Sequence, residues 1–173
     1  MATPKDALAA QLKDLLQDTV QFKFLSHGAH WNVTGINFQQ FHELFQEIYE
    51  DADSAIDPLA ENIRKLNVSA PIQLTDYIES NEETGEMAPT LSTDPVELAK
   101  VVYAANEDCL ECIVKGIILA NAINEQGILN FLAERQDMHS KWQWQLRTIV
   151  GDGFADQNEV NVATVNPQEE NEA

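Results

Sequence analysis

The sequence of 173 residues has only two cysteines, Cys109 and Cys112. Two cysteines are too few for the disulfide framework that holds many small secreted domains together. There is also no second Cys or His pair at zinc-finger spacing, so this CxxC pattern is only a weak indication of zinc binding or redox chemistry. Free cysteine packs like a small hydrophobic residue, and we therefore interpret both residues as part of a helical core.

Long hydrophobic runs are absent as well. No window of the sequence approaches the roughly 20 apolar residues that a helix needs to cross a bilayer. The first ten residues, MATPKDALAA, lack the basic start and apolar run of a secretory leader. The sequence therefore predicts a cytoplasmic protein that is not inserted in a membrane.

Basic residues are scarce: 10 lysines and arginines stand against 29 aspartates and glutamates, for a net charge of −19. Such a surface repels the phosphates of nucleic acids and attracts cations. Only Lys5 and Lys13 precede residue 20, and residues 151–173 contain neither lysine nor arginine. We therefore expect little direct DNA binding. An acidic surface that only aids solubility is the alternative explanation of this charge.

Most of the sequence has the patterns that are typical of α-helices. Thr3 and Asp94 each stand before a proline and a following acid, which is a typical helix start. Apolar residues then recur at threes and fours, and the predicted helices cover about 4–32, 37–66, 95–122 and 125–150. The link over 67–92 is long, with a short helix expected near 75–79, and so crosses the bundle from end to end. We expect an all-α four-helix bundle over 1–150 and a mobile acidic tail over 151–173.

Four residues form a candidate metal-ligand set: His30, His42, Asp57 and Glu61. Imidazole and carboxylate suit iron or zinc, but ligands of one ion must lie within a few ångströms of each other. The fifteen residues from His42 to Asp57 span roughly 22 Å of helix at about 1.5 Å per residue. One site therefore needs Asp57 and Glu61 from a second, antiparallel copy of the chain, and a twofold axis then makes two equal sites.

Helical projection supports this interpretation. At about 100° per residue, the candidate ligands of the second helix fall on a polar stripe separate from its apolar stripe. They therefore face away from the core of their own chain. A shared site would lie at a subunit interface.

The segment FLSHGAHWNVTGINFQQFHELFQEIYEDADSAIDPLAENI closely resembles the signature of Dps proteins, the ferritin-like mini-cages of prokaryotes. The shared elements are HWN at 30–32, the glycine at 35, HE at 42–43 and D-x-x-x-E at 57–61. The resemblance extends over roughly residues 5–150. It implies a ferritin-like bundle that assembles into a hollow dodecamer.

The resemblance also implies a function. Dps proteins oxidise Fe(II) with hydrogen peroxide or oxygen at di-iron ferroxidase sites between twofold-related subunits, and they store the ferric mineral inside. By this resemblance, His30 and His42 of one subunit and Asp57 and Glu61 of the other are the iron ligands. Trp31 is implied to lie beside the site. The activity would protect the cell and its DNA from oxidative damage.

One position departs from the family pattern. Dps proteins usually have an acid four residues after the second histidine, and this chain has Gln46. A neutral amide is a poorer ligand for a hard cation than carboxylate, so the second iron position is expected to be weaker. Glu47 and Glu50 are candidate substitutes that need some rearrangement, and His27 is a candidate extra ligand.

Other residues receive less specific interpretations. Glu125 and Glu134, near the start of the last helix, are candidate pore residues. His139 and Trp142 follow the apolar period of that helix and are expected in the core or at an interface. Two alternatives to a ferroxidase stay open: a non-enzymatic cage that binds iron or zinc at the altered site, and a monomeric bundle with an acidic tail.

Overall fold

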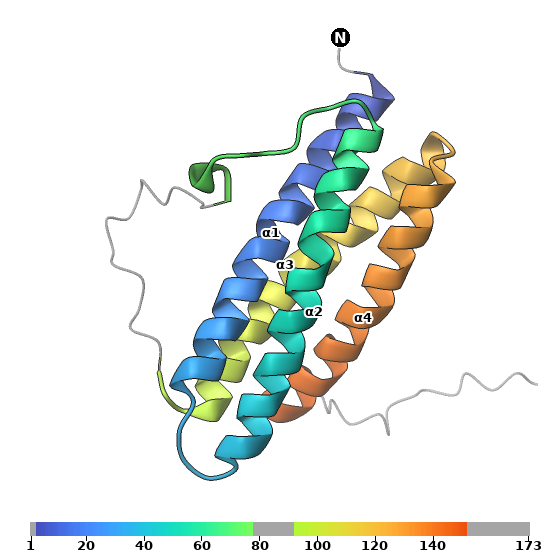
Figure 1. Cartoon of the computed structure of the whole chain (residues 1–173). Coiled ribbons are helices and arrows are strands. Elements are labelled where there is room, and N and C mark those ends of the chain that lie inside the picture. Colours follow the sequence, from blue (N-terminus) through green and yellow to red (C-terminus); the bar gives the residue numbers. More distant parts are fainter. Residues whose placement is uncertain (1–2, 78–91, 152–173) are drawn as a thin grey trace, which may run out of the picture.

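The computed structural model describes residues 3–77 and 92–151, which form the predicted all-α four-helix bundle (Figure 1). Helix α1 covers Pro4–Asn32 and α2 covers Phe38–Lys65, while α3 covers Pro95–Ala122 and α4 covers Gln126–Val150. No strand occurs among these described residues. In the same residues, no helix is both long and apolar enough to cross a bilayer.

The helix starts follow the predicted capping chemistry. Thr3 accepts a hydrogen bond from the backbone of Asp6, whose carboxylate accepts one from the backbone of Thr3 in return. Asp94 accepts hydrogen bonds from the backbones of Val96 and Glu97 at the start of α3. These bonds satisfy backbone donors that a helix leaves free at its first turn, so both helices begin where the sequence predicts.

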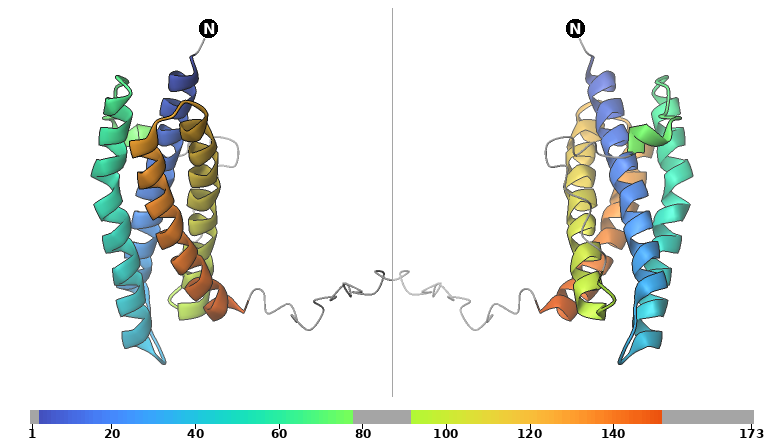
Figure 2. Two further views of the ribbon diagram at one scale, coloured as in Figure 1. Left: turned by 90° about the vertical axis from the view of Figure 1, so that its right-hand side faces the viewer. Right: turned by 90° about the vertical axis from the view of Figure 1, so that its left-hand side faces the viewer.

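Helices α2 and α3 run in the same direction, so the end of α2 and the start of α3 lie at opposite ends of the bundle (Figures 1 and 2). Its described part contains η1, a single 3-10 turn at Leu74–Tyr77 that packs near α1. The short helix predicted near 75–79 is thus one residue off in its start and tighter in geometry. Its last residues and the predicted tail over 152–173 lie outside the described residues.

The core is formed by apolar faces of all four helices, with α1 packed against both α2 and α3, and α3 against α4. Leu8, Leu12 and Phe22 of α1 are fully buried. At Gly116 an added Cβ would lie 3.1 Å from a methyl carbon of Leu132, so α3 and α4 approach closely there. This packing fixes α1 beside α2 and thereby positions the candidate ligands.

Candidate metal centre

The turn between α1 and α2 brings the two candidate histidines together. Gly35 and Asn37 have φ of 95° and 65°, in the left-handed region that glycine and asparagine tolerate best. The backbone N–H of Thr34 also donates to the carbonyl of Thr93, which ties the turn to the segment before α3. The last turn of α1 therefore faces the first turns of α2.

His30 and His42 form a stacked and mutually hydrogen-bonded pair. Their ring centroids lie 3.6 Å apart and their planes are 22° from parallel. The Nδ1 of His30 lies 2.8 Å from the carbonyl oxygen of His42, and the Nδ1 of His42 lies 2.9 Å from that of His30. A carbonyl only accepts, so each Nδ1 carries a proton, and Nε2 is the ring nitrogen that is left to bind a metal ion. The pair is thus prepared to bind metal through two Nε2 atoms.

Further rings surround this pair. Tyr49 of α2 stacks on His27 at 4.0 Å and stands edge-on to His30 at 5.3 Å. The ring of Trp31 also contacts His27, with the two ring centroids 4.0 Å apart. Burial lowers the pKa of His27, with smaller effects from Lys23 and His30 in the same direction, so its imidazole is neutral near pH 7. The sequence interpretation missed Tyr49, although it lies seven residues after His42 and so on the same helix face.

The departure at Gln46 has a local consequence. The side-chain amide nitrogen of Gln46 donates to a carboxylate oxygen of Glu50, one turn further along α2, at 2.7 Å. Glu50 is therefore engaged by the residue that it was expected to replace as a ligand. Glu47 is exposed on the neighbouring face of α2.

Asp57 and Glu61 are exposed on the same continuous helix as His42. Because α2 is unbroken, Asp57 lies roughly 22 Å along the helix axis from His42. In residues 3–77 and 92–151, no cluster of three or more His, Cys, Asp or Glu side chains could hold a metal ion. The single chain thus brings His30 and His42 together without the two carboxylates. That a second copy supplies these carboxylates stays a prediction.

The amino-acid sequence is similar to those of known proteins. A model of the ferritin-like domain matches residues 9–153 of the chain. Antigen TpF1 of Treponema pallidum is 33% identical over 72 residues, which cover 42% of this chain and 41% of that protein. The DNA protection during starvation protein of Brevibacillus brevis is 33% identical over 89 residues, 47% of this chain and 60% of that protein. The chain therefore spans less than two thirds of the length of these relatives.

The fold is also similar to those of solved structures from the same group of proteins. The Dps protein of Vibrio cholerae O1, described as a member of a broad superfamily of ferritin-like diiron-carboxylate proteins, has a TM-score of 0.74 and 25% identity. The match covers 86% of this chain and 96% of that one. The chain belongs to the Dps family of ferritin-like proteins. The family suggested by the sequence signature is thus confirmed.

This Dps protein also contains a buried polar network that its sequence did not indicate. Arg135 of α4 makes two hydrogen bonds, 3.0 and 2.7 Å long, to the carboxylate of Asp51, which also accepts one from Trp142 at 3.2 Å. His139 lies between Arg135 at 3.3 Å and the amide oxygen of Asn106 at 2.9 Å. Burial and the adjacent guanidinium lower the pKa of His139 to about 3, so its ring is neutral. Its predicted place in the core is confirmed.

The cysteines of this Dps protein behave as core residues rather than as a redox pair. Cys109 is fully buried, which raises its thiol pKa well above the ordinary value. Burial and a hydrogen bond with Asp18 raise the pKa of Cys112 to about 12. Both thiols therefore stay protonated, and the thiolate that redox exchange requires is scarce.

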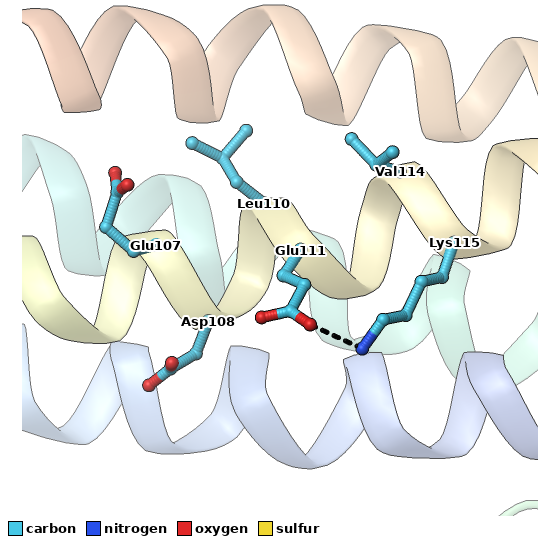
Figure 3. A pocket seen from close by; sticks show the side chains of 6 residues that line it. All are labelled: Glu107, Asp108, Leu110, Glu111, Val114 and Lys115. Carbon is cyan, nitrogen blue, oxygen red and sulfur yellow. Dashed lines mark ion pairs between the residues drawn. The ribbon is translucent and has the colours of Figure 1, made fainter.

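The candidate pore residues occupy different settings. Glu125 precedes α4 and forms an ion pair of 2.9 Å with Lys5, whereas Glu134 is exposed on α4. Figure 3 shows a separate acidic hollow on the outer face of α3, where Glu111 pairs with Lys115 at 2.6 Å. All of its lining residues come from one helix, so it is a shallow surface rather than a converging site. The pore role of Glu125 and Glu134 stays a prediction.

Proposed function

We propose that this Dps protein oxidises Fe(II) with hydrogen peroxide, or with oxygen, at sites shared by two subunits and stores the ferric product inside a dodecameric shell. The observation that carries the proposal is the pair of reciprocal hydrogen bonds between His30 and His42, in which the Nδ1 of each ring donates to the backbone carbonyl of the other residue. It holds two imidazoles in the tautomer that presents Nε2 to a metal ion, before any metal is bound. The diiron-carboxylate description of the Vibrio cholerae Dps protein supports iron as the substrate.

In the proposed site, His30 and His42 bind Fe(II) through Nε2, and Asp57 and Glu61 of the partner subunit neutralise its charge. Both carboxylates are exposed in the single chain and are therefore free to approach a second copy. Two Fe(II) ions side by side give one electron each to a peroxide molecule. With two protons from solvent, the O–O bond breaks to give two water molecules and no hydroxyl radical.

Charge supports the storage role. A dodecamer of chains that each carry −19 has a net charge on the order of −230, which attracts cations and repels nucleic acid. We therefore propose protection of DNA by removal of iron and peroxide, with little direct DNA binding. Glu125 and Glu134 are proposed to line an acidic entry path.

A non-enzymatic cage for iron or zinc is the second candidate, and the Gln46–Glu50 hydrogen bond favours it. Gln46 has a neutral amide where the family pattern has an acid, so the second metal position lacks one negative charge. A site with one firmly held ion binds metal without two adjacent electron donors. Zinc, which has no redox chemistry, suits such a site as a substitute.

Stopped-flow mixing of Fe(II)-loaded protein with hydrogen peroxide tests the proposal. We expect oxidation much faster than in buffer, because adjacent carboxylates and imidazoles stabilise Fe(III) more than Fe(II). Iron oxidation is followed by absorbance, and peroxide consumption is measured on the same samples. Oxidation no faster than in buffer would refute the enzyme. Bound iron or zinc without peroxide consumption would establish the cage instead.

A further inference from the structure

Asp51 of α2 and His139 of α4 both face one nitrogen atom of Arg135. The Nη2 atom of Arg135 lies 2.7 Å from Oδ2 of Asp51 and 3.3 Å from Nε2 of His139. The Nη1 atom of the same guanidinium lies 3.0 Å from the other carboxylate oxygen. A carboxylate and an imidazole therefore converge on one point inside the bundle, and a positive charge of the chain itself occupies that point.

The contacts of His139 direct a lone pair at this point. The side-chain amide of Asn106 donates from Nδ2 to the backbone carbonyl of His139 at 3.0 Å, so its oxygen is the atom that faces Nδ1 of the ring, at 2.9 Å. An amide oxygen only accepts, and Nδ1 therefore carries a proton. A guanidinium only donates, so Nε2 accepts from Arg135 and is the unprotonated nitrogen.

The carboxylate of Asp51 is oriented as well. Its Oδ2 atom accepts a second hydrogen bond, from Nε1 of Trp142 at 3.2 Å. Metal ligands in proteins are commonly held by outer hydrogen bonds of the kind that Trp142 and Asn106 make here. His139 is almost completely buried, whereas the side chain of Asp51 is 17% exposed, so the point between them can be reached from solvent on the α2 side.

This donor set is one that binds metal ions. An imidazole nitrogen with a carboxylate oxygen suits divalent ions such as Fe(II), Co(II) or Zn(II). Their bonds to such ligands are roughly 2 Å long, so an ion in place of Nη2 would need each ligand to approach by about 1 Å. An ion pair with Arg135 needs only the carboxylate. The neutral imidazole adds no charge to that pair, but it is a ligand that these ions favour.

We propose that the guanidinium of Arg135 occupies a divalent-metal position formed by Asp51 and His139, and thereby keeps metal ions out of the interior of the bundle. The permanent charge of arginine takes the place of the ion, and its fork fits the carboxylate. Without this charge, Asp51 and His139 become two free ligands of one site, with water at the remaining positions. This role of Arg135 does not depend on the proposed oxidation of iron.

The test uses the assembled protein with Co(II) as the probe. The parent carries His30→Ala and His42→Ala, so that the candidate metal centre does not contribute. Adding Arg135→Ala is expected to create a site that binds about one more Co(II) ion per chain than the parent does, seen as new visible absorption. The temperature of unfolding of this variant should rise with the Co(II) concentration, because the ion binds only the folded chain.

Three further variants of the parent distinguish this role from simple loosening of the bundle. Arg135→Lys keeps a positive charge and should bind no additional ion. Arg135→Ala with Asp51→Asn lacks one of the two ligands and should lose the additional ion. Lys115→Ala removes the same charge from an exposed face of α3 and should also bind no additional ion.

Arg135→Gln is a second neutral variant that fills more of the space than alanine does, in case the alanine variant does not assemble. It is also expected to bind the additional ion. Neutral variants that bind no additional Co(II), or that do not assemble even when Co(II) is present, would overturn the role of Arg135. Additional binding that persists with Asp51→Asn would do the same. Each of these results would leave the proposed ferroxidase function untouched.

Discussion

Replacing both His30 and His42 by alanine is expected to reduce Fe(II) oxidation to the rate in buffer. The two imidazoles provide the only nitrogen ligands of the proposed site that are already oriented in the single chain. Loss of a group that merely supports a metal ligand typically costs about 10- to 100-fold in activity or affinity, so loss of two ligands should cost at least about 100-fold. The initial rate of Fe(II) oxidation with peroxide measures the effect.

Glu111→Gln is a suitable control, because Glu111 is an exposed acid on α3 that pairs only with Lys115 among the described ion pairs. This variant should keep the wild-type rate. The mass of the assembled particle and its helical content verify that the double variant still folds. A double variant that assembles normally and retains the full rate would show that iron is oxidised elsewhere on the protein.

Arg135→Ala is expected to have the largest effect on stability. Arg135 is 10% exposed and its partner Asp51 is 17% exposed, so the substitution leaves a carboxylate without its cation in a mostly buried place. Breaking one side of a buried ion pair typically costs about 3–5 kcal/mol, and this pair, still partly open to water, should be near the lower figure. The midpoint and slope of unfolding in guanidinium chloride give the change in free energy.

Two comparison variants separate two contributions to the free energy of unfolding: that of the Arg135–Asp51 ion pair and that of an Asp51 carboxylate left without its cation. The double variant Arg135→Met with Asp51→Leu should recover part of the loss, because no buried charge is left without a partner. Lys115→Ala breaks an ion pair on an exposed face and should leave the free energy of unfolding unchanged within error. An Arg135→Ala protein as stable as Lys115→Ala would contradict the structural role of the network.

This network also has a definite pH dependence. Burial would raise the pKa of Asp51, but hydrogen bonds and the charge of Arg135, with a contribution from Trp142, lower it on balance. A carboxylate whose pKa is lowered in the folded state stabilises the fold above its unfolded pKa. That stabilisation is lost as the pH falls through the folded value, so Asp51 contributes to acid unfolding.

The fold could be predicted because its signals are local. Threes-and-fours periodicity and two capped prolines located the helices, and α1 and α3 begin where the capping residues place them. The side of α2 that carries the candidate ligands followed from the same periodicity. Spacing alone predicts that a shared site needs a second copy of the chain, because a continuous helix cannot bring His42 and Asp57 together.

Details that depend on the turn or on tertiary packing could not be predicted in this way. The reciprocal hydrogen bonds of His30 and His42 depend on the left-handed backbone at Gly35 and Asn37 in the turn between α1 and α2. From the sequence, this turn can be predicted only as an interruption of the helical pattern. The sequence does not distinguish Asp51 from the other acids, since its partner Arg135 is 84 residues away in the chain. Tyr49 could have been recognised from its seven-residue spacing to His42, had aromatic residues been projected with the polar ones.

Each proposed iron site takes its histidines from one chain and its carboxylates from another. Mixing two inactive proteins tests it most directly: His30→Ala with His42→Ala, and Asp57→Ala with Glu61→Ala. In a twofold pair of the two kinds, one site has all four ligands and the other has none. Random reassembly from equal amounts is therefore expected to restore about a quarter of the wild-type rate of Fe(II) oxidation.

Each variant reassembled alone serves as the baseline, and mass spectrometry of differently labelled subunits verifies that mixed particles have formed. The shared-site account predicts recovery of activity only in those mixed particles. Mixed particles that remain as inactive as either parent, or a carboxylate variant that is fully active by itself, would contradict it.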